Sequence, residues 1–132
     1  MTLNVQLLDR IASWLENGAV HELPDGSVLT FNMQNWMGPT DCGTAACIAG
    51  AAIAFADPEA VADIAHNPWP MKELQVPDRA RGLLGLNRDE AYALFQPEAD
   101  VEGLDVDEVT PELAAITIRN LITTGLVEWP EP

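Results

Sequence analysis

The feature that most constrains the fold of this chain is an uncharged run of 15 residues, Cys42 to Ala56. Small or apolar residues fill almost every position, so a helix here would be hydrophobic on all sides and therefore buried on all sides. The run is shorter than the roughly 18–20 residues that a membrane-spanning helix needs. We therefore predict a central buried helix over about 42–56, with Thr40 or Asp41 as its N-cap.

Start and stop signals predict further elements on both sides of this run. Apolar residues at helical spacing, or capping residues, predict helices over 3–16, 57–66, 77–84, 87–95 and 110–124. Two β-prone runs, 20–23 and 28–31, flank Pro24-Asp25-Gly26 and predict a hairpin. Residues 126–129 suggest a short strand beside 28–31. Trp69 lies between two prolines and is predicted to lie outside any helix.

Together these elements predict an α-rich α+β fold. Five or six helices would surround the central helix, with a small β-hairpin and an edge strand at one side. A length of 132 residues suits a single globular domain over residues 1–132.

The charge is strongly unbalanced, with 21 acidic against 6 basic residues and a net charge of −15. Such a surface repels phosphate groups and anionic lipids, so neither direct nucleic-acid binding nor membrane binding is expected. Asp9 and Arg10 interrupt the apolar pattern of the first 15 residues, which is unlike a secretory signal. Two cysteines do not make a disulfide framework. We expect a cytoplasmic protein with two free thiols.

Cys42 is the first candidate for chemistry. At the start of a buried helix, a thiol lies beside free backbone N–H groups and the positive end of the helix dipole, which both favour the thiolate. Asp41-Cys42-Gly43 resembles the local pattern around the nucleophile of papain-like cysteine peptidases. His66 or His21 would then be the base, and Gln34 or Asn35 a donor to an oxyanion. Alternatively, both cysteines are small hydrophobic residues that help helices to pack.

The acidic connection between Gln96 and Val109 is the second candidate. Its alternating acidic residues invite comparison with a calcium-binding loop and are Asp100, Glu102, Asp105 and Asp107. Aligned from Asp100, however, the glycine falls at the fourth position and Pro111 at the twelfth, which does not fit an EF-hand. Cys-x4-Cys is not a zinc spacing either. We predict no metal and no cofactor.

The same acidic residues can instead face the basic surface of a protein partner. Trp69, in an exposed Pro-Trp-Pro loop, would either plug the core or anchor that partner. We therefore predict a non-enzymatic protein-interaction module, and keep a papain-like hydrolase or transferase that uses Cys42 and His66 as the alternative. The oligomeric state stays open.

Several motifs also resemble a group of small, uncharacterised bacterial and phage proteins. They are Phe31-Asn32-Met33, Cys42-Gly43-Thr44-Ala45-Ala46-Cys47-Ile48-Ala49-Gly50, Leu84-Gly85-Leu86, Thr110-Pro111-Glu112 and Asn120-Leu121-Ile122. The resemblance implies no established activity, cofactor or catalytic residue. It implies that both cysteines belong to one structural element.

Overall fold

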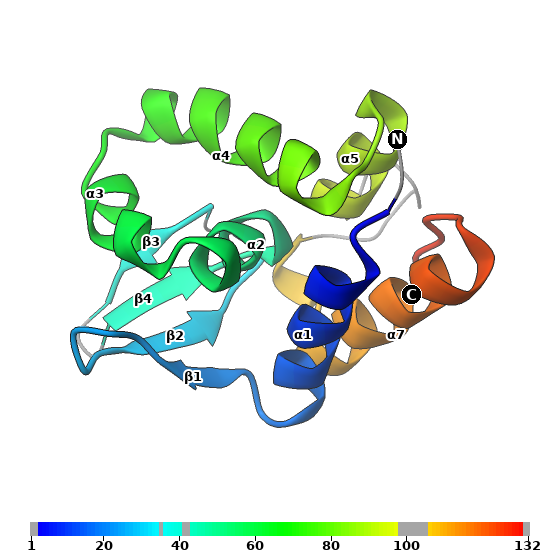
Figure 1. The fold of residues 1–132 in the computed structure, drawn as a ribbon, viewed down its shortest axis with the longest axis horizontal. Helices are drawn as coiled ribbons and strands as arrows, with labels where there is room; N and C mark the ends of the chain where they lie inside the picture. The colour runs from blue at the N-terminus through cyan, green and yellow to red at the C-terminus, as the bar shows by residue number, and fades with distance from the viewer. Residues whose placement is uncertain (1–2, 35, 41–42, 98–105, 131–132) are drawn as a thin grey trace.

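A computed structural model describes residues 3–34, 36–40, 43–97 and 106–130 of the chain (Figure 1). The fold is α-rich, with helices packed around and beside a small sheet. The α-helices are α1 (Val5–Glu16), α2 (Ile48–Ala56), α3 (Val61–Ala65), α4 (Trp69–Leu84), α5 (Arg88–Phe95) and α7 (Pro111–Thr124), and the 3-10 helices are η1 (Pro58–Ala60) and η2 (Val106–Glu108). In the described part of the chain, no helix is both long and apolar enough to cross a bilayer.

The sheet has the strand order β1-β2-β4-β3. Its strands are β1 (Val20–Glu22), β2 (Val28–Phe31), β3 (Gly38–Pro39) and β4 (Gly43–Ala46). β1 and β2 form the predicted antiparallel hairpin, whereas β2 and β4 run parallel, with Val28 opposite Gly43. A Cβ atom on Gly43 would lie 2.1 Å from the carbonyl oxygen of Val28, so only glycine allows the two strands to lie this close.

The prediction of one helix over about 42–56 is wrong at its start. Gly43–Ala46 is strand β4, and α2 begins only at Ile48, with Cys47 at the N-cap position. Thr40 therefore does not cap this helix, and Asp41 lies outside the described residues. A short run of small apolar residues has no periodicity that separates a buried strand from a buried helix. The partner strand β2 decides the conformation, since tertiary pairing overrides local propensity.

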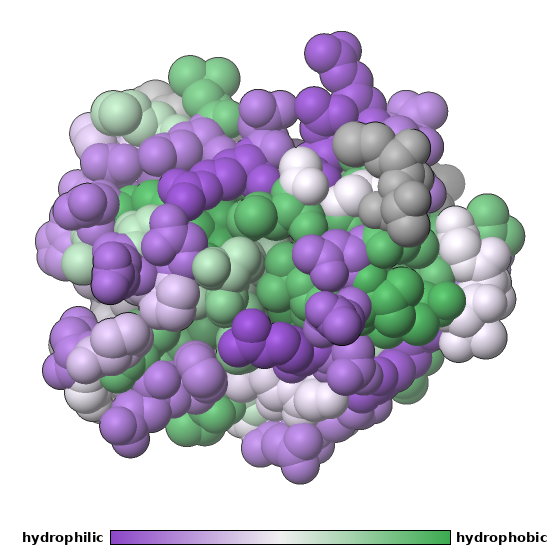
Figure 2. Space-filling view, in the orientation of Figure 1, coloured by the Kyte–Doolittle hydropathy of each residue, from purple (hydrophilic) through white to green (hydrophobic). Residues whose placement is uncertain are grey.

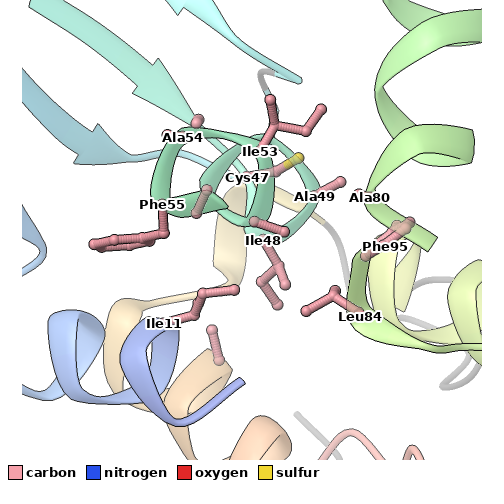
Figure 3. Packing of buried hydrophobic residues seen from close by; sticks show 14 of the residues in the cluster. Ile11, Cys47, Ile48, Ala49, Ile53, Ala54, Phe55, Ala80, Leu84 and Phe95 are labelled. Carbon is pink, nitrogen blue, oxygen red and sulfur yellow. The ribbon is translucent and has the colours of Figure 1, made fainter. Parts of the chain in front are cut away.

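The prediction that this run forms a central buried helix is confirmed from Ile48 onward, because α2 is the buried centre of the molecule. Every residue from Ile48 to Phe55 is buried. Figure 3 shows α2 surrounded by side chains from three other helices: Ile11 of α1, Ala80 and Leu84 of α4, and Phe95 of α5. A Cβ atom on Gly50 would lie 1.8 Å from the carbonyl oxygen of Trp36, so α2 also touches the backbone of the segment between β2 and β3.

Helix α4 differs most from its prediction. The predicted helix started at Pro77, whereas α4 starts eight residues earlier. Trp69 is its first residue, so the prediction that Trp69 lies outside any helix is wrong. Pro70 follows within the first turn, where the backbone N–H groups have no partner within the helix, and a proline there loses no hydrogen bond. Pro77 lies inside the helix. Burial of Val76, Ala80 and Leu84 against the core offsets its cost.

The two ends of the described chain are held against the rest of the fold. α1 and α7 pack side by side (Figure 1), and Arg119 of α7 forms ion pairs with Asp9 and Glu16 of α1. Leu126–Trp129 is not the predicted strand, since β2 already has β1 and β4 as neighbours. Instead, the indole Nε1 of Trp129 donates to the carbonyl of Ala93 in α5.

Candidate functional site

Cys42 and Asp41 lie outside the described residues, but the structure describes their neighbours Thr40 and Gly43. The backbone N–H of Thr40 donates to the carbonyl of Gly43 at 2.8 Å, and the N–H of Gly43 donates to Oγ1 of Thr40 at 3.0 Å. The basis for a helix-activated Cys42 is nevertheless gone, because α2 begins six residues after it. The helix dipole acts at Cys47 instead.

His66 shares a cavity with Gly43, the residue that follows Cys42 in the sequence. The cavity has a volume of about 250 Å³ and lies between the β1–β2 turn, the start of β4 and helix α3. Nδ1 of His66 lies 2.8 Å from the carbonyl oxygen of Ala62. Because a carbonyl only accepts, Nδ1 carries the proton of the neutral ring and Nε2 keeps a free lone pair. His66 is exposed, and His21 packs on Phe55 with 4.7 Å between ring centroids.

Cys47 has the local position that was expected for Cys42, but its buried environment disfavours the thiolate. It is buried, and burial raises the pKa of its thiol to about 11, although nearby backbone N–H groups of Gly50 and Ala49 lower it. Its Sγ lies 3.9 Å from the carbonyl oxygen of Trp36. Cys47 is therefore a packing residue at the start of α2.

The predicted binding residues are mostly beyond what the structure describes. Asp100, Glu102 and Asp105 lie outside the described residues, and so does Asn35, whereas Asp107 is exposed in η2. The side chain of Trp69 is not described either, although its backbone starts α4. Gln34 is exposed and borders a different cavity from His66, together with Asp107. The two are not brought together as base and oxyanion donor.

A site that was not predicted from the sequence lies between α4 and α5. This groove, called the α4–α5 groove below, has a volume of about 320 Å³. Its apolar wall consists of Trp36, Leu74, Pro77, Ala91, Tyr92 and Phe95. Phe95 and Ala91 are buried, whereas Leu74 is 80% exposed and Tyr92 60% exposed. Ligand sites are typically concave and apolar with a few polar groups, and this groove has that composition.

Two of the polar residues that line the α4–α5 groove are cationic, and one is anionic. Arg81 and Arg88 line it, together with Asp78 and Gln96. Arg81 makes a single ion pair with Asp78 at 3.3 Å, and the Asp78 side chain is 76% exposed. Arg88 is exposed, and among the residues that the structure describes it makes no ion pair. In an acidic protein, two arginines at one apolar groove are a local reversal of charge.

Three separate segments position this groove. Helix α4 supplies Leu74, Pro77 and Arg81 at helical spacing and ends at Gly85, which is in the left-handed conformation. Helix α5 then starts with a capping box between Asn87 and Glu90. Trp36 comes from the segment between β2 and β3, whose backbone rests on Gly50 of α2. One signal in the sequence does point here: four of the six basic residues fall between Lys72 and Arg88.

Comparison of the chain with protein-family models, with curated proteins and with solved structures finds no match. Among the described residues, no three His, Cys, Asp or Glu side chains are grouped so that they could hold a metal ion.

Proposed function

We propose that this protein is a non-enzymatic protein-interaction module, and that it binds a segment of its partner in the α4–α5 groove. The observation that carries the proposal is the exposure of Leu74 and Tyr92 beside a concave wall formed by Trp36 and Phe95. Large apolar side chains next to a hollow gain free energy when a partner covers them, about 1.5–3 kcal/mol for a fully buried leucine.

Among the described residues, two other exposed apolar side chains, Val5 and Ile116, line none of the three cavities above. On the face drawn in Figure 2, hydrophobic surface shows between hydrophilic side chains over α1 and α7. Val5 and Ile116, which are 46% and 50% exposed, belong to these two helices. Single exposed apolar residues are common on protein surfaces and need no partner. Ile116 is therefore a suitable control position.

We further propose that the partner carries a basic surface and that the encounter takes place in the cytoplasm. The net charge of −15 supports the first point, since opposite charges accelerate association, and the exposed Asp107, Glu108 and Glu112 lie close together in sequence on η2 and α7. The same charge opposes direct binding of nucleic acid. The free, buried thiol of Cys47 supports a reducing compartment.

Selection from a random peptide library displayed on phage tests the proposal. We expect peptides that bind the wild-type protein and the Ile116→Ser control equally, but bind the double variant Leu74→Ser/Tyr92→Ser at least about tenfold more weakly. Both substituted side chains are exposed, so the variant should fold, and circular dichroism checks this. If no selected peptide distinguishes the groove variant from the control, the proposal is wrong.

A cysteine-dependent hydrolase or transferase remains the second candidate. The observation that favours it is the cavity shared by Gly43 and His66, with Nε2 of His66 free to accept a proton. The rate of alkylation of Cys42, measured by mass spectrometry from pH 4 to 10, tests it. This candidate would be supported by an alkylation midpoint at a pH well below ~8.5, the value of a free thiol, provided that the midpoint rises in His66→Gln. A midpoint near 8.5 that ignores the His66 substitution would exclude it.

A further inference from the structure

The arginine side chains of this protein differ in the contacts that they make within the fold. Arg79 pairs with Asp57 at 2.7 Å, and Arg119 pairs with Asp9 and Glu16. Arg10 lies over the ring of Phe55 and donates to its carbonyl oxygen. These arginines are used within the fold. Arg81 and Arg88 remain at the α4–α5 groove, the first held by one ion pair of 3.3 Å and the second by none among the described residues.

The chemistry of these two arginines favours one kind of occupant. A guanidinium group presents a planar fork of N–H donors that matches a carboxylate, and the match strengthens where apolar surface excludes water. The groove provides such surface on Trp36, Tyr92 and Phe95. A segment with an aromatic or leucine side chain and a neighbouring carboxylate would use both features at once.

We infer that the α4–α5 groove recognises an acidic apolar peptide segment: a large apolar side chain enters the groove, and a flanking Asp or Glu pairs with Arg81 and Arg88. This inference rests on the proposed function and deepens it: the acidic residue belongs to the bound segment, and the basic surface proposed for the partner lies outside that segment. The rest of the protein surface repels such a segment, but at physiological ionic strength this repulsion is screened over about 8 Å. At contact distance the two arginines therefore decide the preference.

The composition of the selected peptides tests the inference. We expect Asp or Glu to be enriched beside an aromatic residue or leucine. Affinity should fall about tenfold in Arg81→Gln/Arg88→Gln, as for the loss of a hydrogen-bonded charge. Arg79→Gln is the matched control, because Arg79 lies on the same helix but does not line the groove.

A second measurement compares two peptides on the same protein, so that a folding defect in a variant would affect both peptides alike. One selected peptide is synthesised in two forms, with its acidic residues intact or replaced by Asn or Gln. We expect the amide form to bind the wild-type protein about tenfold more weakly, and both forms to bind Arg81→Gln/Arg88→Gln equally. Neutral or basic peptides that depend on Leu74 and Tyr92 but ignore the arginines would overturn this inference and leave the proposed function standing. Absence of any groove-dependent peptide would overturn both.

Discussion

Replacement of Gly50 by alanine should destabilise the fold and disturb the α4–α5 groove together. The new Cβ atom would lie 1.8 Å from the carbonyl oxygen of Trp36, whereas real Cβ atoms essentially never come closer than 3.0 Å. The two backbones must therefore separate by about 1.2 Å. Such overpacking costs about 1–3 kcal/mol, and we expect the upper end because neither backbone can rotate away. Alanine returns up to about 1 kcal/mol of helix propensity, so the net loss is about 2 kcal/mol.

Gly82→Ala is the matched control, because Gly82 also lies in a helix but has no atom within 4 Å of its ideal Cβ position. This variant should gain about 0.5–1 kcal/mol. Urea unfolding followed by circular dichroism gives both free energies of unfolding. Binding of a selected peptide should weaken in Gly50→Ala, since Trp36 must shift, and stay unchanged in Gly82→Ala. If the two variants are equally stable, α2 does not rest on the Trp36 carbonyl as described.

Three further predictions concern other contacts. The hydrogen bond from Arg119 lowers the pKa of Glu16, so at low pH the unfolded chain binds more protons than the folded protein. The stability that this pair contributes is present above the ordinary pKa of 4.5 and is lost as the pH falls. In urea titrations, Arg119→Gln should therefore make the free energy of unfolding depend less on pH. The Cys47 thiol, with a pKa of about 11, should be ionised in only about one molecule in a thousand at pH 8. In the variant Cys42→Ser, iodoacetamide should therefore modify Cys47 far more slowly in the native protein than in the urea-unfolded chain. Equal rates would contradict the burial of Cys47. Trp129→Phe removes the donor to the Ala93 carbonyl, whereas Nε1 of Trp14 has no partner in the described part of the chain. In the same assay, Trp129→Phe should therefore lower the free energy of unfolding by about 1 kcal/mol more than Trp14→Phe. An equal loss would count against the hydrogen bond to Ala93.

Local chemistry was sufficient to predict several elements of this fold. Asn87 and Glu90 form the capping box that their spacing indicates, and Thr110 and Gly125 cap the two ends of α7. The hairpin around Pro24-Asp25-Gly26 is also where the turn residues predict it. In each case the residues that determine the structure lie within a few positions of one another, so their effect can be read without knowledge of the rest of the chain.

Prediction failed where contacts between segments that are distant in the sequence determine the local structure. Gly43–Ala46 is a strand because β2, 15 residues earlier, offers it a parallel partner. Pro77 is tolerated inside α4 because the core covers its neighbours Val76 and Ala80. The α4–α5 groove needs Trp36, Arg81 and Arg88 from three segments, and no spacing in the sequence shows that they meet. The clustering of basic residues was visible, but not the hollow beside it.

The pairing of α1 with α7 also bears on how the chain is made. Arg119 and Asp9 are 110 positions apart, so the apolar face of α1 emerges from the ribosome long before its partner helix exists. At about 5–20 residues per second, this delay is roughly 5–20 seconds. During that time α1, whose buried residues include Leu8, Ile11 and Leu15, lacks its neighbouring helix α7. A nascent chain stalled before Pro111 should therefore be recognised by hydrophobic-binding chaperones, and release of the last helix should end that recognition.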